Sequence, residues 1–563
     1  MNLLGRAMEK EFWQEVREKE CFEGYRNSLL KDWEETVKAG DLKALRYSDF
    51  KRFFVDGNRS VYEASYSFQK KAMTTSALLS LVYPEEEKYI VYLMDVIYTL
   101  CDAYTWCLPA HQPKLEENNN CHIDLCGAGM AFYLAEIYTL LGDRLEPLIR
   151  SRINAELDRR VFKPFLENVP YSWWETGTSN WTAVCMGSVA CAFMLMRPEK
   201  AKELIPRFTK SMEGFISGFS NEGVCFEGGG YWNYGFGNFL PYADMIEKFT
   251  NGEVSYFDNP KIKLISTFYY KIFLTGNVVA NFADCGEYGG RVIGRMHFLA
   301  KKYPDEMKRS GCENSSFSST YEFPTRLCEV LWYYEEEKNA EQKESESEFY
   351  APEAEWLIKR CEHYGFAAKG GHNAEHHNHN DVGHFIFAKD GRQILCDLGS
   401  GVYTKQYFSP ERYNILETSA RSHSVPIIDG NLQKNGREFA AKDFKYENGI
   451  LSVDIAGAYE CLSDNERIER SFTVGEKGVK LTDRFTFDKK HDVVERFVSK
   501  IEPDISTRGI VYINGVALKY DAEIWEAFVS SEPTSKEGVF CYMTDLKPTR
   551  EVNDFTLIIG EFK

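Results

Sequence analysis

Five of the eleven histidines of the chain lie within one stretch, Gly370–Phe387, with the sequence GGHNAEHHNHNDVGHFIF. Neutral imidazoles are the commonest metal ligands and the commonest general bases near neutral pH. The apolar run Val382–Phe387 predicts a strand. If the segment before it is already extended, His377 and His379 point to the same face. Such a pair can bind one metal together, or it can give one imidazole to a metal and the other to a substrate.

Two further candidate ligands follow at strand-like spacing. Asp397 comes just after a short apolar run in RQILCDLGSG, and His423 lies just before another in TSARSHSVPIIDG. Two histidines and one carboxylate on neighbouring strands suit Zn²⁺ or another transition ion. The alternative is a solvated, histidine-rich loop without a metal. The spacing of the downstream aspartate and histidine favours the metal site.

The composition of the 563 residues is globular, with 44% hydrophobic and 15% aromatic residues, and the length predicts two or three domains. A formal charge of −18 argues against nucleic acid as a partner, because phosphate binding needs clustered Lys and Arg. The fifteen cysteines show no disulfide-like pattern, so we expect free thiols in a reducing compartment. With no apolar signal-peptide core and no run near the roughly 18 apolar residues of a membrane span, we expect a cytoplasmic protein without membrane contact.

The first part of the chain, to about residue 335, has the apolar spacing of helices. Four stretches show it: Leu78–Tyr104, Ile123–Leu141, Asn180–Met196 and Lys261–Phe273. Loops rich in Gly, Pro and Trp separate them at 106–113, 169–181 and 220–239. Long helices that alternate with such loops predict an (α/α) toroid, an incomplete helical barrel. An irregular helical bundle is the alternative.

A charged tract without apolar anchors, Glu335–Glu348, marks a boundary, and after it the apolar period changes to two. Apolar residues alternate from Phe472 to Phe487 around the turn Gly475–Gly478, which predicts a hairpin. The pattern continues in Val453–Ala458, Val493–Val498, Ile510–Ile513 and Phe555–Ile559. We therefore expect a helical toroid domain over residues 1–345 and a C-terminal antiparallel β-sandwich over 346–563.

Two stretches of the helical half carry groups that could contact a substrate. In TSNWTAVCMGSVA, the amide of Asn180 lies at the first turn of a helix, where it can cap the helix or donate to a substrate carboxylate. In EGGGYWNYGFGNF, Gly228–Gly230 allow the backbone to approach a ligand closely. Tyr231, Trp232 and Tyr234 then present two phenols and an indole. A tyrosine hydroxyl here is a candidate proton donor.

With these stretches together, the chain resembles the heparinase II/III-like polysaccharide lyases. The matching motifs are SNWTAV, GYWNYG, HNHND, DLGSGVY and SARSHSVPIIDG, with a weaker match in ERIERSFTV and VKLTDRF. The resemblance implies an N-terminal (α/α) toroid, a C-terminal β-sandwich and β-elimination at uronic-acid glycosidic bonds. The implied substrates are acidic glycans of the heparin or heparan type, another glycosaminoglycan, or an alginate. Without a secretion signal, we expect action on imported oligosaccharides from a chain end, with a possible homo-oligomer.

The resemblance also implies site residues. Asn180 matches the position that neutralises the uronate carboxylate, Tyr234 the acid, and His377 the catalytic histidine of the β domain, which is expected to face Tyr234 across the domain junction. A tyrosine of the β domain assists in some members, and the sequence does not choose among Tyr403, Tyr407 and Tyr413. The implied zinc ligands are His379, Asp397 and His423, and the ion is expected to be structural. Trp181 stands next to Asn180, where several members have a histidine.

The substrate is expected to contact six further residues: Trp106, His111, Trp181, Tyr231, Trp232 and Arg412. Three other functions stay open. In a cupin-like enzyme, His377 would join the three zinc ligands around a catalytic metal. A non-catalytic glycan-binding protein could keep the fold. A hydrolase would need two carboxylates about 5–9 Å apart, and Glu222 and Glu227 are available without an argument that pairs them.

Overall fold

A computed structural model describes residues 2–40, 42–112, 114–115, 120–307, 315–317, 320–334 and 347–562. The chain forms two compact units. The first, which we name the helical unit, comprises Met1–Gly218, Asn233–Lys263 and Gly290–Gln342; the second, the β unit, comprises Phe219–Trp232, Leu264–Gly289 and Lys343–Lys563. Two segments of the N-terminal half therefore pack with the β unit. The division at residue 345 stays a prediction, and most of the charged tract expected as a linker, residues 335–346, lies outside the described residues.

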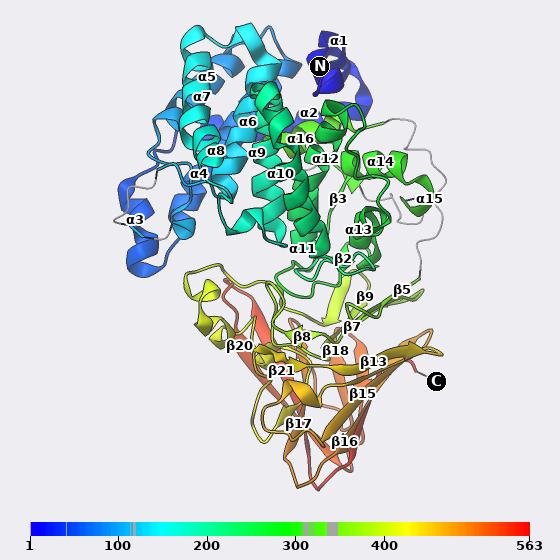
Figure 1. The fold of residues 1–563 in the computed structure, drawn as a ribbon. Helices are drawn as coiled ribbons and strands as arrows, with labels where there is room; N and C mark the ends of the chain where they lie inside the picture. Colours follow the sequence, from blue (N-terminus) through cyan, green and yellow to red (C-terminus); the bar gives the residue numbers. More distant parts are fainter. Residues whose placement is uncertain are drawn as a thin grey trace. The chain divides into compact units, whose positions relative to one another are not determined.

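Helices α1 to α10, α12 and α14 to α16 make up most of the helical unit (Figure 1). Their bounds are α1 Lys10–Glu18, α2 Glu23–Lys38, α3 Tyr47–Asp56, α4 Ser60–Val82, α5 Glu87–Asp102, α6 Leu125–Leu141, α7 Pro147–Leu157, α8 Lys163–Glu167, α9 Asn180–Met196, α10 Pro198–Ser217, α12 Gly237–Phe249, α14 Ile293–Lys302, α15 Pro304–Met307 and α16 Phe323–Leu331. Two further helices are α11 Gly229–Tyr231, which is short, and α13 Pro260–Lys271, whose residues are divided between the two units. Consecutive helices pair, as in α4 with α5 and α9 with α10, which is the (α/α) arrangement expected from the sequence.

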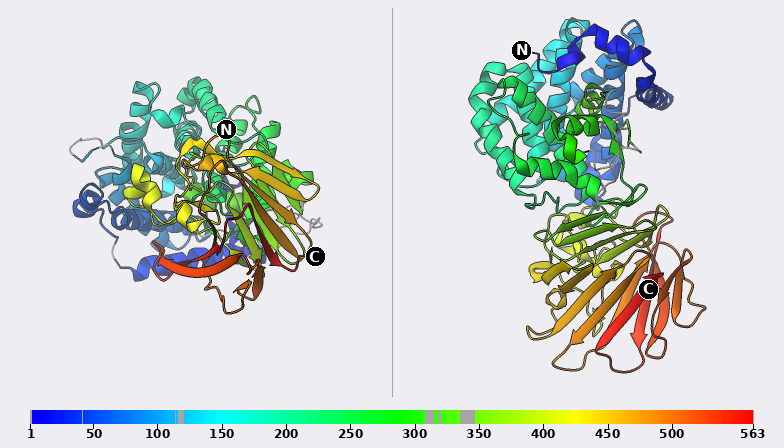
Figure 2. Two further views of the ribbon diagram at one scale, coloured as in Figure 1. Left: turned by 90° about the horizontal axis from the view of Figure 1, so that it is seen from below. Right: turned by 90° about the vertical axis from the view of Figure 1, so that its right-hand side faces the viewer.

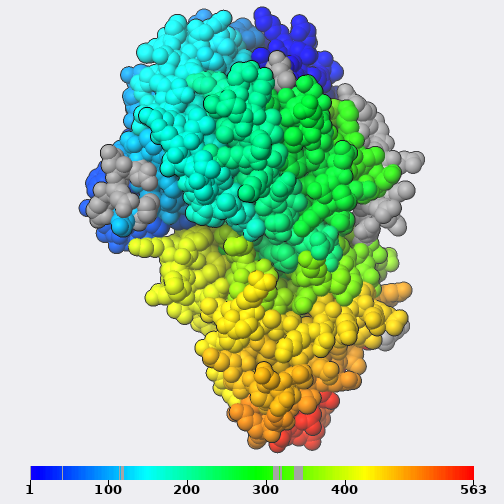
Figure 3. Space-filling view, viewed as in Figure 1, coloured from blue at the N-terminus to red at the C-terminus, as the bar shows by residue number. Residues whose placement is uncertain are grey.

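Helix α9 lies at the centre of the helical unit, against α6, α10 and α12. It is apolar on every side, and its residues from Thr182 to Met194 are all buried. A helix without a polar face must be surrounded by other helices, because no side of it gains from contact with water. In Figure 3 the parts of the chain coloured cyan and green form a closely packed surface.

One predicted helix and one predicted loop differ in the structure. The stretch Leu78–Tyr104 is divided between α4 and α5 by a turn at residues 83–86. Pro84 lies in this turn, and proline cannot continue a helix because it has no backbone N–H and its ring clashes with the preceding turn. The predicted loop 220–239 contains α11 and a π-helical turn, Trp232–Phe236.

The helical segment Leu125–Arg144 has the length and apolar composition of a membrane span, which corrects the expectation that the chain has no such run. In the structure 61% of its most apolar window is buried among the other helices, as in the core helix of a globular fold. The fourteen described cysteines are free, as the sequence analysis expected.

Three antiparallel sheets make up the core of the β unit (Figure 2). The five-stranded sheet has the order β10 (Arg392–Leu395), β9 (Phe385–Lys389), β7 (Gly365–Lys369), β6 (Trp356–Arg360) and β5 (Glu348–Ala351). The seven-stranded sheet has the order β13 (Lys442–Glu447), β14 (Ile450–Asp454), β15 (Arg467–Val474), β16 (Gly478–Thr486), β22 (Asp554–Gly560), β19 (Val516–Lys519) and β18 (Ile510–Ile513). The four-stranded sheet has the order β11 (Ile427–Ile428), β17 (Val493–Ser499), β21 (Phe540–Pro548) and β20 (Trp525–Pro533).

The hairpin expected around Gly475–Gly478 is present as β15 and β16, with Phe472 opposite Leu481 and Val474 opposite Val479. Apolar residues of the five- and seven-stranded sheets share one core, which includes Phe366 and Phe385 from the first and Phe472 and Leu481 from the second. Two sheets that bury their inner faces against each other form a sandwich. The predicted fold class is therefore confirmed. Short two-stranded ladders complete the chain: β1 (Phe273–Thr275) with β2 (Val278–Val279), β12 (Gly436–Ala440) with β8 (His372–Asn373), and the parallel pair β3 (Arg291–Val292) and β4 (Ser315–Ser316).

Candidate active site and metal cluster

His377 lies in a turn and not on an extended segment, so the predicted alternation with His379 is wrong. Its φ of 58° is in the left-handed region, which costs about 1–3 kcal/mol for a residue with a side chain. The turn places the ring on Tyr231, with the two ring centroids 4.0 Å apart and nearly parallel. Nδ1 of His377 lies 2.8 Å from Oδ2 of Asp284, and Nε2 lies 3.7 Å from Oε2 of Glu227.

Asp284, which the sequence analysis missed, is the centre of this cluster. The carboxylate accepts hydrogen bonds from His377, from Nε2 of His379 at 3.1 Å and from Arg412 at 3.0 Å. The hydroxyls of Tyr403 and Tyr407 also donate to it. Burial opposes its ionisation, but these histidines and the guanidinium hold the pKa of the carboxyl well below its usual range. Asp284 follows Ala283, whose φ is 63°, in a Gly-containing segment without strand or helix periodicity, so no sequence pattern marked it.

The ionised Asp284 determines the tautomer of His377. A carboxylate only accepts hydrogen bonds, so Nδ1 of His377 must carry a proton. In the neutral ring, Nε2 then has a free lone pair and can act as a base. This is the arrangement by which a buried aspartate orients a catalytic histidine in hydrolases.

The three candidate tyrosines of the β domain differ in their contacts. Tyr403 lies with its hydroxyl 2.9 Å from that of Tyr231, and 3.3 Å from Oδ2 of Asp284. Because Tyr403 donates to the carboxylate, its oxygen accepts from Tyr231. Tyr407 is fully buried on Asp284, and Tyr413 donates to the side chain of Asn378 at 2.7 Å. Of the three tyrosines, only Tyr403 hydrogen-bonds to Tyr231, whose ring stacks on His377.

The glycine run before Tyr231 is required for packing within the β unit. A Cβ on Gly228 would lie 2.5 Å from the carbonyl oxygen of Phe282, and one on Gly229 would lie 2.4 Å from Ile272. Gly228 also has a φ of 89°, which disfavours any other residue. The glycines therefore allow this segment to pack against the backbone that carries Asp284.

The helical unit holds the other predicted catalytic residues. Helix α9 begins at Asn180, as predicted, and Asn180 is 3% exposed. A Cβ on Gly235 would lie only 3.0 Å from Cβ of Asn180, so the turn that carries Tyr234 packs directly on the start of α9. Burial raises the pKa of Tyr234, whose phenol therefore keeps its proton at neutral pH.

Two of the residues expected to contact substrate form a pair in the helical unit. The ring of His111 meets the ring of Trp181 edge-on, with centroids 4.8 Å apart. Nδ1 of His111 lies 2.6 Å from Oδ2 of Asp124, a buried residue that caps α6. Both rings are half-buried, so each keeps some surface for a ligand.

Three other expected substrate contacts are corrected by the structure. Trp106 and Trp232 are 2% and 0% exposed, and each indole N–H donates to a backbone carbonyl, of Leu100 and Ile265 respectively. Neither ring has a free face for a sugar, because both fill the core. The guanidinium of Arg412 points inward and donates to Asp284 and to the backbone carbonyls of Tyr407 and Asn378, which favours a role in positioning Asp284 over a direct contact with substrate.

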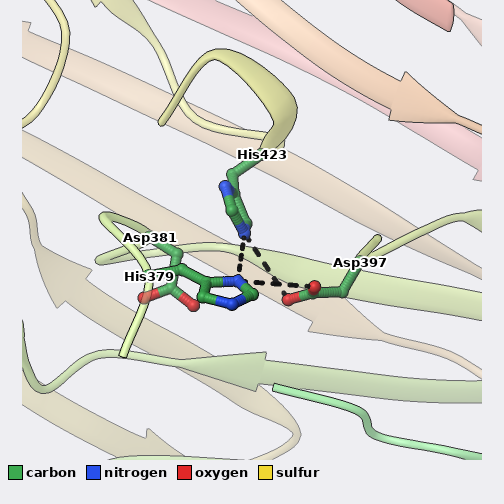
Figure 4. Close-up of side chains that lie close together, drawn as sticks. All are labelled: His379, Asp381, Asp397 and His423. Carbon is green, nitrogen blue, oxygen red and sulfur yellow. Dashed lines mark hydrogen bonds and ion pairs between the residues drawn. The ribbon is translucent and has the colours of Figure 1, made fainter. Parts of the chain in front are cut away.

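The three predicted zinc ligands converge in the β unit, together with a second carboxylate, Asp381 (Figure 4). Nδ1 of His379 lies 3.2 Å from Nε2 of His423. The oxygens of Asp397 lie 3.8 Å from the first nitrogen and 3.6 Å from the second. Asp381 belongs to the HNHND motif, but the sequence analysis gave it no role.

The donor set fits a divalent cation. Nε2 of His379 donates to Asp284, and Nδ1 of His423 donates to the carbonyl of Ser419 at 2.8 Å, so both facing nitrogens carry lone pairs in the neutral rings. Among the described residues, Oδ2 of Asp397 has no hydrogen-bond partner. Two lone pairs and a buried carboxylate repel one another unless a proton or a metal ion lies between them. Two imidazoles and carboxylates, each oriented by an outer hydrogen bond, are typical of zinc sites.

A comparison with protein families matches residues 347–560 to the family "Heparinase II/III-like, C-terminal". Among solved structures, heparinase III is similar over 88% of this chain and 77% of that chain, with a TM-score of 0.66 and 14% identity. The heparan sulfate lyase HepC from Pedobacter heparinus is similar over 94% and 82%, with a TM-score of 0.59 and 14% identity. The chondroitin AC lyase of Streptomyces coelicolor A3 is similar over 100% and 83%, with a TM-score of 0.59 and 12% identity. No curated protein sequence matches the chain.

Proposed function

We propose that the protein is a lyase of uronic-acid-containing glycans, because residues 347–560 match the heparinase II/III-like family and the chain has the fold of toroid polysaccharide lyases. The single observation that carries the proposal is the pair of His377 and Asp284, a base held in the required tautomer. The proposed substrates are acidic oligosaccharides of the heparan, other glycosaminoglycan or alginate type, taken from a chain end in the cytoplasm.

The proposed reaction is a β-elimination. Nε2 of His377 takes the proton from C5 of the uronic acid, and negative charge develops on the carboxylate of the sugar. The amide of Asn180 donates to that carboxylate and stabilises it most strongly in the transition state. The C4–O4 bond breaks, a C4=C5 double bond forms, and the phenol of Tyr234 gives its proton to the departing O4.

Tyr231 and Tyr403 have a positioning role in this scheme. The ring of Tyr231 supports the imidazole of His377, and its hydroxyl bond to Tyr403 connects that support to Asp284. A divalent ion, when bound by His379, Asp397 and His423, would supply a positive charge that holds their three segments together. His379 connects these residues to Asp284 through its other nitrogen.

The geometry weighs against the cupin-like alternative. In that enzyme His377 would bind the metal, but the fourth member of the ligand cluster is Asp381 and not His377. The two glutamates considered for the hydrolase alternative have different partners: Glu222 accepts from the backbone N–H of Glu353, and Glu227 lies near His377.

A panel of heparan, chondroitin, hyaluronan and alginate oligosaccharides tests the proposal, because the C4=C5 double bond of the product absorbs ultraviolet light. We expect one class to give rising absorbance with the native protein. His377→Ala should abolish the signal. His376→Ala, an exposed neighbour in the same turn, should retain it. A native protein that binds one of these oligosaccharides without ever producing the absorbance would instead support the non-catalytic alternative.

A further inference from the structure

Helix α6 contains one charged residue, Glu136, in the apolar sequence LCGAGMAFYLAEIYTLL. Its side chain is 1% exposed, and among the described residues its Oε2 has no hydrogen-bond partner. Burial raises the pKa of this carboxyl well above its usual range, which favours the neutral form that can donate a hydrogen bond. A buried polar group without a partner destabilises the fold, and an apolar residue at this position would avoid that cost.

Glu136 lines a cavity of about 500 Å³ that lies wholly within the helical unit. The walls come from α6, α12, α14, α16 and the N-terminal segment, and α16 contacts the three other helices. Small-molecule sites typically have volumes of roughly 300–1,000 Å³ and combine apolar walls with a few polar groups. This cavity has both features, and none of its lining residues belongs to the catalytic or metal clusters described above.

One wall is aromatic. The rings of Phe298 and Trp332 are stacked, with centroids 4.3 Å apart, and both line the cavity. A flat aromatic pair next to a hydrogen-bonding carboxyl suits a sugar, whose ring has an apolar face and a rim of hydroxyls. The protonated Glu136 can donate to one hydroxyl and accept from another.

The charges around the cavity favour an anion. Four cationic residues line it, Arg6, Lys248, Lys301 and Lys302, against two further acids, Asp244 and Glu247. The acids pair with Lys248 at 2.6 Å and with Lys302 at 2.9 Å. Lys301 lies over the ring of Tyr334 at 4.1 Å, and within the described chain it has no carboxylate partner. Arg6 pairs with Glu15 at 2.9 Å, so Lys301 is the lining cation for which an anionic ligand would supply the counter-charge.

We propose that this cavity is a second ligand site, separate from the catalytic groups, for a single hexose-sized sugar that carries one anionic group. The hydroxyls bind Glu136, the ring lies against Trp332, and the anion binds Lys301. A carboxylate and a phosphate share this chemistry, so an acidic monosaccharide and a sugar phosphate are the two sources. Only the choice of glucuronate as a probe rests on the proposed function.

Calorimetric titration of the full-length protein with D-glucuronate, glucose 6-phosphate and glucose tests the site. We expect one of the two anionic sugars to bind with a stoichiometry of one and at least tenfold more tightly than glucose. Glu136→Leu and Lys301→Met should each weaken that binding at least tenfold. His377→Ala should leave it unchanged. The matched controls are Glu199→Leu and Lys200→Met, which change exposed residues of α10.

Glu136→Leu also has a stability readout that shows whether the variant folds. The pKa of Glu136 is higher in the folded protein than in the unfolded chain. The free energy by which Glu136 destabilises the fold therefore grows as pH rises above the unfolded pKa of about 4.3. The variant should therefore unfold at a higher temperature than the native protein at pH 8, and by a smaller margin at pH 5.

Three results would overturn the proposal: neither anionic sugar binds, binding survives both cavity variants, or binding disappears in His377→Ala. None of these depends on cleavage, which is measured separately by ultraviolet absorbance. If the lyase proposal is rejected, the test of the cavity site is unaffected. If the cavity site is rejected, the lyase proposal is likewise unaffected.

Discussion

Asp284 hydrogen-bonds to His377 through one oxygen and to His379 through the other, at 2.8 Å and 3.1 Å. A single carboxylate thus orients the proposed base and one proposed metal ligand at once. One nitrogen of each imidazole donates its N–H to Asp284 in a hydrogen bond. The opposite nitrogen of each neutral ring therefore has a lone pair that can bind a proton or a metal ion. The proposed proton abstraction and the proposed metal binding would therefore both depend on Asp284.

Asp284→Asn should lower kcat by about 10²–10⁴-fold, the usual value of a well-placed general base. The amide can donate as well as accept, so it no longer holds Nδ1 of His377 protonated. The activity profile should also shift along the pH axis, which a change confined to folding would not cause. Rates from pH 5 to 9 measure both effects. Asp390→Asn, in an exposed turn, is the control, and equal losses in the two variants would contradict the role.

Tyr234→Phe should lose about 10²–10⁴-fold in kcat with little change in substrate binding, because the phenol acts only in the transition state. Tyr231→Phe should lose tenfold or less, since its ring still supports His377 and only the bond to Tyr403 is removed. Steady-state kinetics on the substrate found in the panel compares the two. If the order of the losses is reversed, Tyr231 and not Tyr234 is the acid.

Protein purified without chelator should contain about one zinc ion per chain, measured by elemental analysis. Chelation should lower the unfolding temperature, because the buried carboxylate of Asp397 would then lack its counter-charge. Asp397→Ala should lower metal content and stability together. His363→Ala, at an exposed histidine, should change neither. A metal-free native protein whose stability is unaffected by chelator would reject the site.

Glu466 provides a pH dependence outside the catalytic region. Burial opposes its ionisation, but the backbone N–H of Ser463 and the ring of His491 lower its pKa to about 2. Because this is below the unfolded value of about 4.3, its stabilisation is complete above about pH 6 and declines as pH falls.

Glu466→Gln should therefore lower the free energy of unfolding at pH 7, and by about half as much at pH 3. Thermal unfolding followed by circular dichroism at the two pH values measures this. Glu460→Gln, which changes an exposed acid of a surface ion pair, should have a small effect at both. A loss of equal size at both pH values would mean that the charge of Glu466 does not matter.

Local patterns in the sequence determined much of the fold. Helix α9 occupies the predicted Asn180–Met196, and the β15–β16 hairpin turns where the glycines predicted it, because the apolar period and the turn residues act over a few neighbours. His379, Asp397 and His423 could be grouped because each lies beside a strand. The bounds that differ, such as the division of Leu78–Tyr104, depend on a single residue, Pro84, that outweighs the surrounding pattern.

Only the tertiary structure decided the contacts between distant segments. Asp284 stands 93 residues before His377, in a segment without periodicity, and nothing local shows that it reaches the histidines. The burial of Trp106 and Trp232, the inward direction of Arg412 and the isolation of Glu136 beside a cavity follow from which helices and strands pack together. Residue type and spacing are local properties, whereas burial and partnership are set by the whole packed unit, so the sequence alone indicates the chemistry while the fold selects the residues that perform it.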